Sequence, residues 1–199
     1  EGARSAPRLA YDFPGNTCIS VNDALAHGIP SAAVVLREGD LVNVDVSAEL
    51  DGFWADTGAS AAVGEVSARH RTLLDVTRVA RDEAIATVRA GARVGVVGRA
   101  VERRAKRHGF RVIRNIGGHG VGRYIHEEPH VANHFDPSAR TVLHEGLVLA
   151  IEPFLTTGAT QVIEDADGWT LRTPDGSRGA QFEHTVVVTR GAPIILTAA

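Results

Sequence analysis

Apolar and polar residues alternate on both sides of the dipeptide Asp51-Gly52, in the stretch LVNVDVSAELDGFWADTGAS. An Asp-Gly pair between two β-rich runs predicts a hairpin with a two-residue loop. In that register Asp45 lies opposite Gly58, so Asp45 and Asp56 are diagonal neighbours on one face, about 7 to 8 Å apart at Cα. Like charges this close repel unless a cation lies between them or one stays protonated. A three-residue loop would break this parity, and the simpler alternative is two unrelated aspartates that face solvent.

Apolar residues recur at helical spacing between positions 67 and 91. The segment starts at Ser67, a good N-cap residue, and stops at Gly91, which predicts one long helix. A second apolar stripe, from about 95 to 108, lies opposite a group of basic residues and ends at Gly109. We interpret these basic side chains as the solvated face of a second helix.

The last third of the chain consists of short apolar runs, FRVIRN, LVLAIEPFL, TQVIEDADGWTLRT and QFEHTVVVT, separated by glycine, proline and aspartate. Such runs predict strands and hairpins. Strands, then helices, then strands, without regular alternation, favour an α+β fold over a doubly wound sheet. Because no Gly/Ser-rich or Pro-rich linker divides the chain, we expect residues 1–199 to form a single domain.

Composition narrows the functional classes. With 199 residues, 44% of them hydrophobic, the chain is long enough to bury a core as one domain. A formal charge of −3 gives no global reason to bind nucleic acid or a membrane surface. We expect neither a spanning helix nor a secretory signal, and the single cysteine, Cys18, favours a cytoplasmic location. The chain contains no methionine, so Glu1 is not expected to be the original start.

The stretch GGHGVGRYIHEEPH, residues 117–130, contains three histidines, two glutamates and four glycines. A solvated loop is the better interpretation of any one of these residues. For the whole set it is weaker, because glycines let the backbone approach something closely at an entropic cost. The segment is therefore a candidate functional site.

Two further carboxylates enter apolar runs. Glu152 follows the run at 147–151, and Glu183 shares one face of its strand with Gln181 and Thr185. A carboxylate in a buried strand is costly unless it is paired. Two Asp, two Glu and one His from five segments suit one or two divalent metals such as Mn, Fe, Co or Zn. Metals in such a site activate water and polarise a carbonyl, which predicts hydrolase chemistry.

Two more histidines could serve that chemistry. His126, in YIHEEP, and His27, in HGIP, could bind a developing oxyanion or a leaving amide nitrogen. Alone, each is more often a surface histidine than a catalyst. Other catalytic frameworks lack support: nothing local lowers the pKa of Cys18, and the chain has no GxSxG elbow, Walker A motif or dinucleotide fingerprint.

From Tyr11 to Thr189 the sequence resembles the type I methionine aminopeptidases, which have the pita-bread metallopeptidase fold. The motifs CISVNDALAHGIP, NVDVSAELDGFWADTG, GGHGVGRYIHEEPHV, LAIEP and DGWTLRT, followed by AQFEHTVVVT, occur in the order of that family. The resemblance implies an α+β fold with a curved antiparallel sheet and helices on its outer face. It also implies hydrolytic removal of the initiator methionine from nascent chains with a small second residue.

The resemblance further implies a dinuclear metal centre held by Asp45, Asp56, His119, Glu152 and Glu183. Asp56 and Glu183 would bridge two divalent ions, which could be Co, Mn, Fe or Zn. His119 and Glu152 would complete one site, and Asp45 would chelate the other ion. A bridging water would be the nucleophile, with Glu152 as its proton acceptor.

The substrate contacts implied by the resemblance come from two groups of residues. His27 would contact the scissile amide, and His126 would contact the carbonyl oxygen or the tetrahedral oxyanion. Four residues fall where the family lines the methionine side-chain pocket: Phe13, Cys18, Ile125 and Trp169. Plain core packing is the alternative for those four. The implied partners are a peptide or nascent polypeptide and the ribosome, and a monomer is expected.

The sequence departs from the family pattern in three places. Ala150 stands where a threonine is common, and we expect that change to be mild. Ala10 stands where a second aromatic residue is usual, so we expect a more open pocket rim. The helices that precede YDFP in the family are absent, which predicts an N-terminally truncated fold with an exposed apolar patch on the half formed by residues 15–60.

Two alternative functions remain open. An X-Pro aminopeptidase or prolidase would share the five ligands, although HGIP favours the methionine branch. A truncated, inactive pita-bread binding module would have lost the ligands, and all five are present.

Overall fold

The computed structural model describes residues 2–198, which fold into short antiparallel sheets and three helices. The first sheet is built from four strands, which are β1 (Arg4–Ser5), β2 (Cys18–Val21), β4 (Leu41–Leu50) and β5 (Phe53–Ala62). The second is built from five strands, which are β7 (Gly117–Gly120), β8 (Glu127–Ala132), β9 (Val148–Ile151), β14 (His184–Val187) and β15 (Ile194–Ile195).

Two three-stranded sheets complete the strand content. One contains β6 (Arg111–Val112), β10 (Phe154–Thr156) and β13 (Gly179–Gln181). The other contains β3 (Ala24–Ala26), β11 (Ile163–Glu164) and β12 (Leu171–Arg172). The expected α+β fold, with its β-rich last third, is confirmed.

The predicted hairpin is the longest β-structure in the described chain. β4 and β5 pair antiparallel with Asp45 opposite Gly58, and the two loop residues have positive φ, 53° at Asp51 and 80° at Gly52. Positive φ at both central positions is the requirement of a type I′ turn, which Asp-Gly meets. Asp45 and Asp56 therefore share the face that the register predicted.

The predicted helices are present, with one boundary corrected. α2 (Ala68–Ile85) is capped by the Ser67 side chain, which accepts a hydrogen bond from the His70 backbone N–H at 3.2 Å. It ends at Ile85 rather than at Gly91. The residues after Ile85 form tight turns, and Val88 within them is fully buried. The apolar pattern therefore extends past the end of the helix, which is why the predicted boundary was too late.

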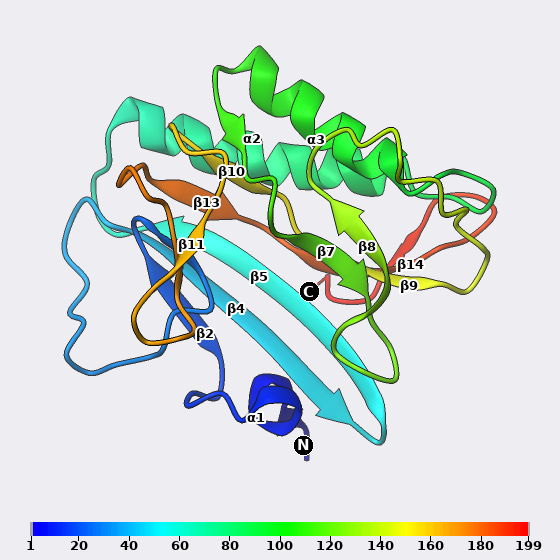
Figure 1. Ribbon diagram of the computed structural model, residues 1–199, viewed down its shortest axis with the longest axis horizontal. Helices are drawn as coiled ribbons and strands as arrows, with labels where there is room; N and C mark the ends of the chain where they lie inside the picture. The colour runs from blue at the N-terminus through cyan, green and yellow to red at the C-terminus, as the bar shows by residue number, and fades with distance from the viewer. Residues whose placement is uncertain (1, 199) are drawn as a thin grey trace.

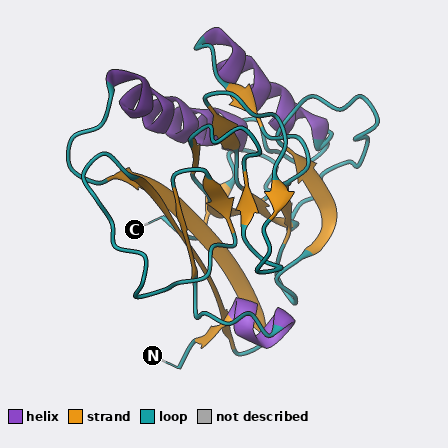
Figure 2. Ribbon diagram, turned by 60° about the vertical axis from the view of Figure 1, so that its left-hand side comes forward, coloured by secondary structure: helices purple, strands orange, loops and turns teal. Residues whose placement is uncertain are grey.

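The second helix, α3 (Gly95–Arg107), matches its predicted bounds, and Gly109 follows it with φ 72°. α2 and α3 lie over one side of the curved sheets, whereas α1 (Ala6–Tyr11) lies on the other side near the hairpin (Figures 1 and 2). Among the described residues, none of the helices has the length and apolar character needed to cross a membrane.

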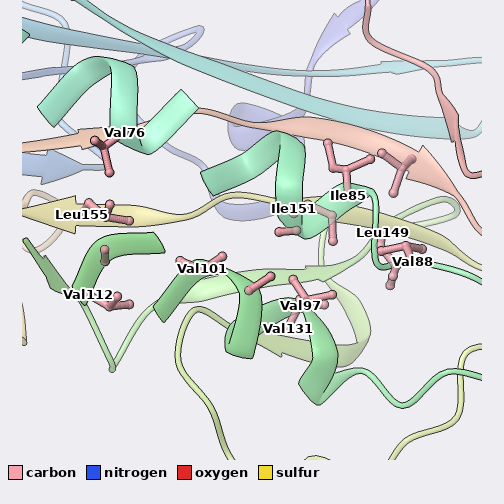
Figure 3. Packing of buried hydrophobic residues seen from close by; sticks show 14 of the residues in the cluster. Val76, Ile85, Val88, Val97, Val101, Val112, Val131, Leu149, Ile151 and Leu155 are labelled. Atoms are coloured by element: carbon pink, nitrogen blue, oxygen red, sulfur yellow. The ribbon is translucent and has the colours of Figure 1, made fainter. Parts of the chain in front are cut away.

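The main apolar core lies between the two long helices and the sheets (Figure 3). Leu73 of α2 and Val101 of α3 are fully buried, as is Leu149 of β9. Burying side chains of this size contributes about 1.5 to 3 kcal/mol each. This core holds in place the strands that carry the polar residues of the candidate site described below.

The opposite face of the β4–β5 hairpin is not covered. Val44 and Val46 remain 39% and 45% exposed. They alternate along β4 with Asn43 and Asp45, which face the interior. The expected exposure of apolar side chains within residues 15–60 is confirmed for Val34, Val35, Leu36, Val44, Val46, Leu50 and Phe53.

Candidate metal centre

Three buried side chains from distant strands converge beneath the hairpin. Asp56 of β5, His119 of β7 and Glu183, which lies between β13 and β14, each offer one ligand atom, and these atoms lie within 4.8 Å of one another. Glu152 follows β9, and its Oε1 is 3.5 Å from Nε2 of His119. Asp45 lines the same cavity as Asp56, His119 and Glu152. The structure thus brings together the five residues singled out from the sequence.

Backbone and hydroxyl hydrogen bonds connect the hairpin to the strand that carries Glu183. The Glu183 N–H donates to the Gly58 carbonyl at 2.8 Å. The Thr185 hydroxyl accepts from the Asp56 N–H at 2.9 Å and donates to the Asp56 carbonyl at 2.7 Å. These bonds fix the backbones of the two carboxylate-bearing strands relative to each other.

The glycine-rich stretch forms β7 and β8 rather than a long loop. His119 lies opposite Ala150 of β9. A Cβ on Gly118 would be only 2.2 Å from the Ala150 carbonyl oxygen. The sequence predicted that the glycines let the backbone approach something closely. At Gly118 the backbone approaches the neighbouring strand β9, and not a metal or a peptide. This approach allows His119 to lie deep in the sheet.

The carboxylates are costly to bury in their charged form. Burial raises the pKa of Asp45, Glu152 and Glu183 well above the usual range, and repulsion by Asp56 adds to it. Burial also raises the pKa of Asp56 to about 6. A positive charge among these groups would remove most of that cost.

Two buried oxygens at this site have no hydrogen-bond partner among the described residues. They are Oδ1 of Asp56 and Oε1 of Glu183. Unpaired buried oxygens are rare, and an ion is one of their common explanations. Because both belong to the converging set, the donors present fit divalent cations that take oxygen and imidazole ligands.

His119 is a neutral imidazole with one bare nitrogen. Its Nδ1 lies 2.9 Å from the Gly120 carbonyl oxygen, which can only accept, so Nδ1 carries the proton and Nε2 is bare. Burial lowers its pKa to about 4, so the ring is neutral near pH 7. The bare Nε2 faces the carboxylates of Glu152 and Asp56.

The sequence placed Gln181 on the same face as Glu183 but did not indicate that Gln181 and Asn43 support the site. The Gln181 side chain donates to Oε2 of Glu183 at 3.0 Å, and its own oxygen accepts from the Asn43 amide at 2.7 Å. One oxygen of Glu183 is thus held while the other stays open. The alternation of Gln181 with Glu183, and of Asn43 with Asp45, is the sequence signal that could have indicated them.

A cavity of about 430 Å³ opens beside the carboxylates. His27 and His126 line it, and so do the four candidate pocket residues Phe13, Cys18, Ile125 and Trp169. Phe13 and Trp169 pack edge to face, with ring centroids 5.2 Å apart. Burial raises the pKa of the Cys18 thiol to about 12, which leaves it unreactive.

Tyr11 is a cavity residue that the sequence did not indicate. It ends α1, lines the cavity and hydrogen-bonds through its hydroxyl to Nδ1 of His126. Ala10, beside it, is exposed on the helix. Only the approach of α1 to the β7–β8 turn in three dimensions makes the contact between Tyr11 and His126.

Comparison with known proteins places this geometry in a family. Residues 4–190 match metallopeptidase family M24. The chain is 49% identical over 197 residues to methionine aminopeptidase 2 of Bacillus subtilis, covering 98% of this chain and 79% of that protein.

Solved structures give the same result. The chain is similar to a methionine aminopeptidase from Thermotoga maritima, with a TM-score of 0.96 and 40% identity, over 99% of this chain and 79% of that one. It is less similar to a prolidase from Pyrococcus furiosus, with a TM-score of 0.73 and 25% identity, over 92% of this chain and 49% of that one.

Proposed function

Because this chain belongs to metallopeptidase family M24, we propose that the converging side chains hold two divalent metal ions. The chain has the pita-bread fold, and its activity is the hydrolytic removal of an N-terminal methionine, as in the methionine aminopeptidases that it matches over nearly its whole length. The proposed ligands are Asp45, Asp56, His119, Glu152 and Glu183. The observation that carries the proposal is the convergence of buried carboxylates, two with unpaired oxygens, on a neutral imidazole.

Four carboxylates and one imidazole offer enough oxygen atoms for two ions that share ligands. Asp56 and Glu183 are the proposed bridging residues, because each has a buried oxygen without a protein partner. Mn, Fe, Co and Zn all accept this donor set, and metal availability decides among them. When bound, such ions polarise the scissile carbonyl and make a water molecule nucleophilic near neutral pH.

The chain's own residues supply the proton transfers and the orientation. Glu152 would take the proton of the attacking water and return it to the leaving amine, a role open to a carboxylate that lines the cavity. His126 donates to the carbonyl oxygen as negative charge develops there. His27, which also lines the cavity, binds the scissile amide.

The apolar part of the cavity receives the methionine side chain. Phe13, Ile125 and Trp169 form this wall, and Cys18 lies at its base beside Asp45. An unbranched thioether fits irregular apolar pockets of this kind. A small second residue is the proposed preference. The prolidase alternative is weaker, because similarity to a prolidase is limited to 25% identity.

The proposed cellular setting follows from the same site. Nascent polypeptides are the proposed substrates, with the ribosome as the place of encounter. Every proposed ligand comes from one chain, which supports a monomeric enzyme. The single, buried cysteine supports a cytoplasmic location.

Peptide hydrolysis with defined metals tests the function. Metal-free protein is supplied with Mn, Co or Fe and given Met-Ala-Ser or a peptide with proline second. We expect free methionine from Met-Ala-Ser alone, and two metal ions per chain by elemental analysis. Cleavage of only the proline peptide would move the enzyme to the prolidase branch, and one ion per chain would contradict the dinuclear centre.

Two glutamate variants test the catalytic assignment. Glu152→Gln should lower kcat by about 10²-fold to 10⁴-fold, the usual contribution of a general base. Glu145→Gln, at an exposed glutamate paired with Arg190, should leave kcat unchanged. Equal activity of the two variants would remove Glu152 from the mechanism.

A further inference from the structure

The hydrogen bond between Tyr11 and His126 is not used by the mechanism above. It joins residues 115 positions apart, and the two rings lie with their centroids 5.5 Å apart at 42°. The His126 ring also packs against His119, with centroids 4.2 Å apart. The His126 ring therefore contacts both Tyr11 and a proposed metal ligand.

The end of α1 places Tyr11 by several contacts. Ala6, at the start of the helix, is fully buried against Ile125. Asp12 follows Tyr11 with φ 57°, and its N–H donates to the Arg8 carbonyl at 3.1 Å, which closes the helix. Because the backbone at Tyr11 is already fixed, forming a hydrogen bond through its hydroxyl costs less conformational entropy than it would on a flexible segment.

The bond has a consequence for the position of the proton on His126. A neutral imidazole carries one proton, on either Nδ1 or Nε2. Burial raises the pKa of Tyr11, so its hydroxyl keeps its proton and can donate. If that hydroxyl donates to Nδ1, then Nδ1 is bare and the ring proton lies on Nε2.

We propose that Tyr11 is a positioning residue: its hydroxyl donates to Nδ1 of His126 and keeps the ring proton on Nε2. That nitrogen then donates to the carbonyl oxygen of the substrate. The inference rests on the proposed function of His126 as an oxyanion donor. The reverse bond, from Nδ1–H to the phenol oxygen, leaves Nε2 bare and unable to serve as that donor.

The test compares Tyr11→Phe with Tyr124→Phe, at the chain's only other tyrosine, which is 70% exposed. Phenylalanine keeps the ring and removes the hydroxyl, and an unchanged Tm verifies folding. The imidazole nitrogen shifts of His126 are measured in ¹⁵N-histidine-labelled, metal-free protein, with the signals assigned from a His126→Gln variant.

In the wild type and in Tyr124→Phe, we expect a protonated Nε2 and a bare Nδ1. In Tyr11→Phe the two shifts should move toward each other, because the ring exchanges between tautomers. In metal-loaded enzyme, kcat for Met-Ala-Ser should fall about 10-fold to 100-fold in Tyr11→Phe, with KM and metal content unchanged.

Several outcomes would overturn the proposal. A proton on Nδ1 of His126 in the wild type would show that His126 donates to the Tyr11 oxygen, which is the reverse of the proposed hydrogen bond. Nitrogen shifts in Tyr11→Phe equal to those of Tyr124→Phe also remove the role, even if kcat falls, because Tyr11 would then act on the substrate itself. Failure of the wild type to cleave Met-Ala-Ser would instead count against the proposed function, and the nitrogen shifts would still decide the tautomer.

Discussion

At the scale of single residues, the candidate metal centre is a group of acids held where their charges are unfavourable. Burial raises the pKa of Asp56 to about 6, and it also raises the pKa values of Asp45, Glu152 and Glu183 well above the usual range. Without metal, such groups retain protons at a pH where exposed acids are ionised. A metal ion must therefore displace protons to bind.

This proton displacement predicts the pH dependence of metal affinity. Because the pKa values are raised in the metal-free protein, affinity should rise with pH through about pH 6, where Asp56 loses its proton, and continue to rise above it. His119, with a pKa lowered to about 4, contributes no proton in this range. Calorimetric titration with Mn²⁺ in buffers of different ionisation enthalpy measures both the affinity and the protons released.

The control for this measurement is Asp167→Asn. Asp167 is exposed, and hydrogen bonds from Thr170 hold its pKa below the usual range. Its loss should leave the pH profile unchanged. An affinity that stays constant between about pH 5 and pH 8 would contradict the proton-displacement account.

At the scale of elements, α3 packs very closely against the end of β8 and the residues that follow it. Gly98 lies on the buried side of α3, where a Cβ would be 2.1 Å from the His134 carbonyl oxygen and 2.5 Å from that of Ala132. These are backbone atoms, so they cannot move aside as a flexible side chain would. The glycine therefore allows the helix to lie directly on the sheet that carries His119.

Gly98→Ala tests this packing. In an exposed helix the change stabilises by about 1 kcal/mol. Here we expect it to lower the free energy of unfolding by about 2 kcal/mol, because added volume in a close-packed contact forces the backbone apart. Urea denaturation measures the change, with Arg103→Ala, at an exposed position of the same helix, as the control. A gain in stability at Gly98 would show that α3 can shift freely.

At the scale of the whole molecule, the two sides of the curved sheets differ in character. The helices α2 and α3 cover one side (Figure 1). Val44 and Val46, on the other face of the hairpin, remain exposed. The hairpin thus has one face directed to the acidic site and one apolar face directed outward.

Dye binding can locate this outer surface. The chain should enhance the fluorescence of an apolar-surface dye such as ANS, and the double variant Val44→Thr, Val46→Thr should reduce it, because threonine keeps the β-branched shape. The control is Ile163→Thr with Ile194→Thr, at residues that are more exposed, 54% and 56%, and lie on short strands elsewhere. Equal signals from the two double variants would place the dye on another surface.

Much of the site could be predicted because its signals are local. The type I′ turn at Asp51-Gly52 sets the register of the hairpin, and the two-residue period of a strand then decides which face Asp45 and Asp56 occupy. The motifs that resemble methionine aminopeptidases named the remaining candidates, and all of them except Glu183 line one cavity, with Glu183 beside it.

By itself, the amino-acid sequence determined the fold class and the hairpin register, since turn chemistry and periodicity act between near neighbours, and its motifs named the candidate residues of the centre. Only the tertiary structure decided where α2 ends and which residues Tyr11 contacts, namely His126. It also shows that a side chain at Gly118 or Gly98 would clash with a neighbouring backbone. Each of these depends on how closely distant backbones approach, and the close packing of a protein interior sets that distance only after the whole chain has folded.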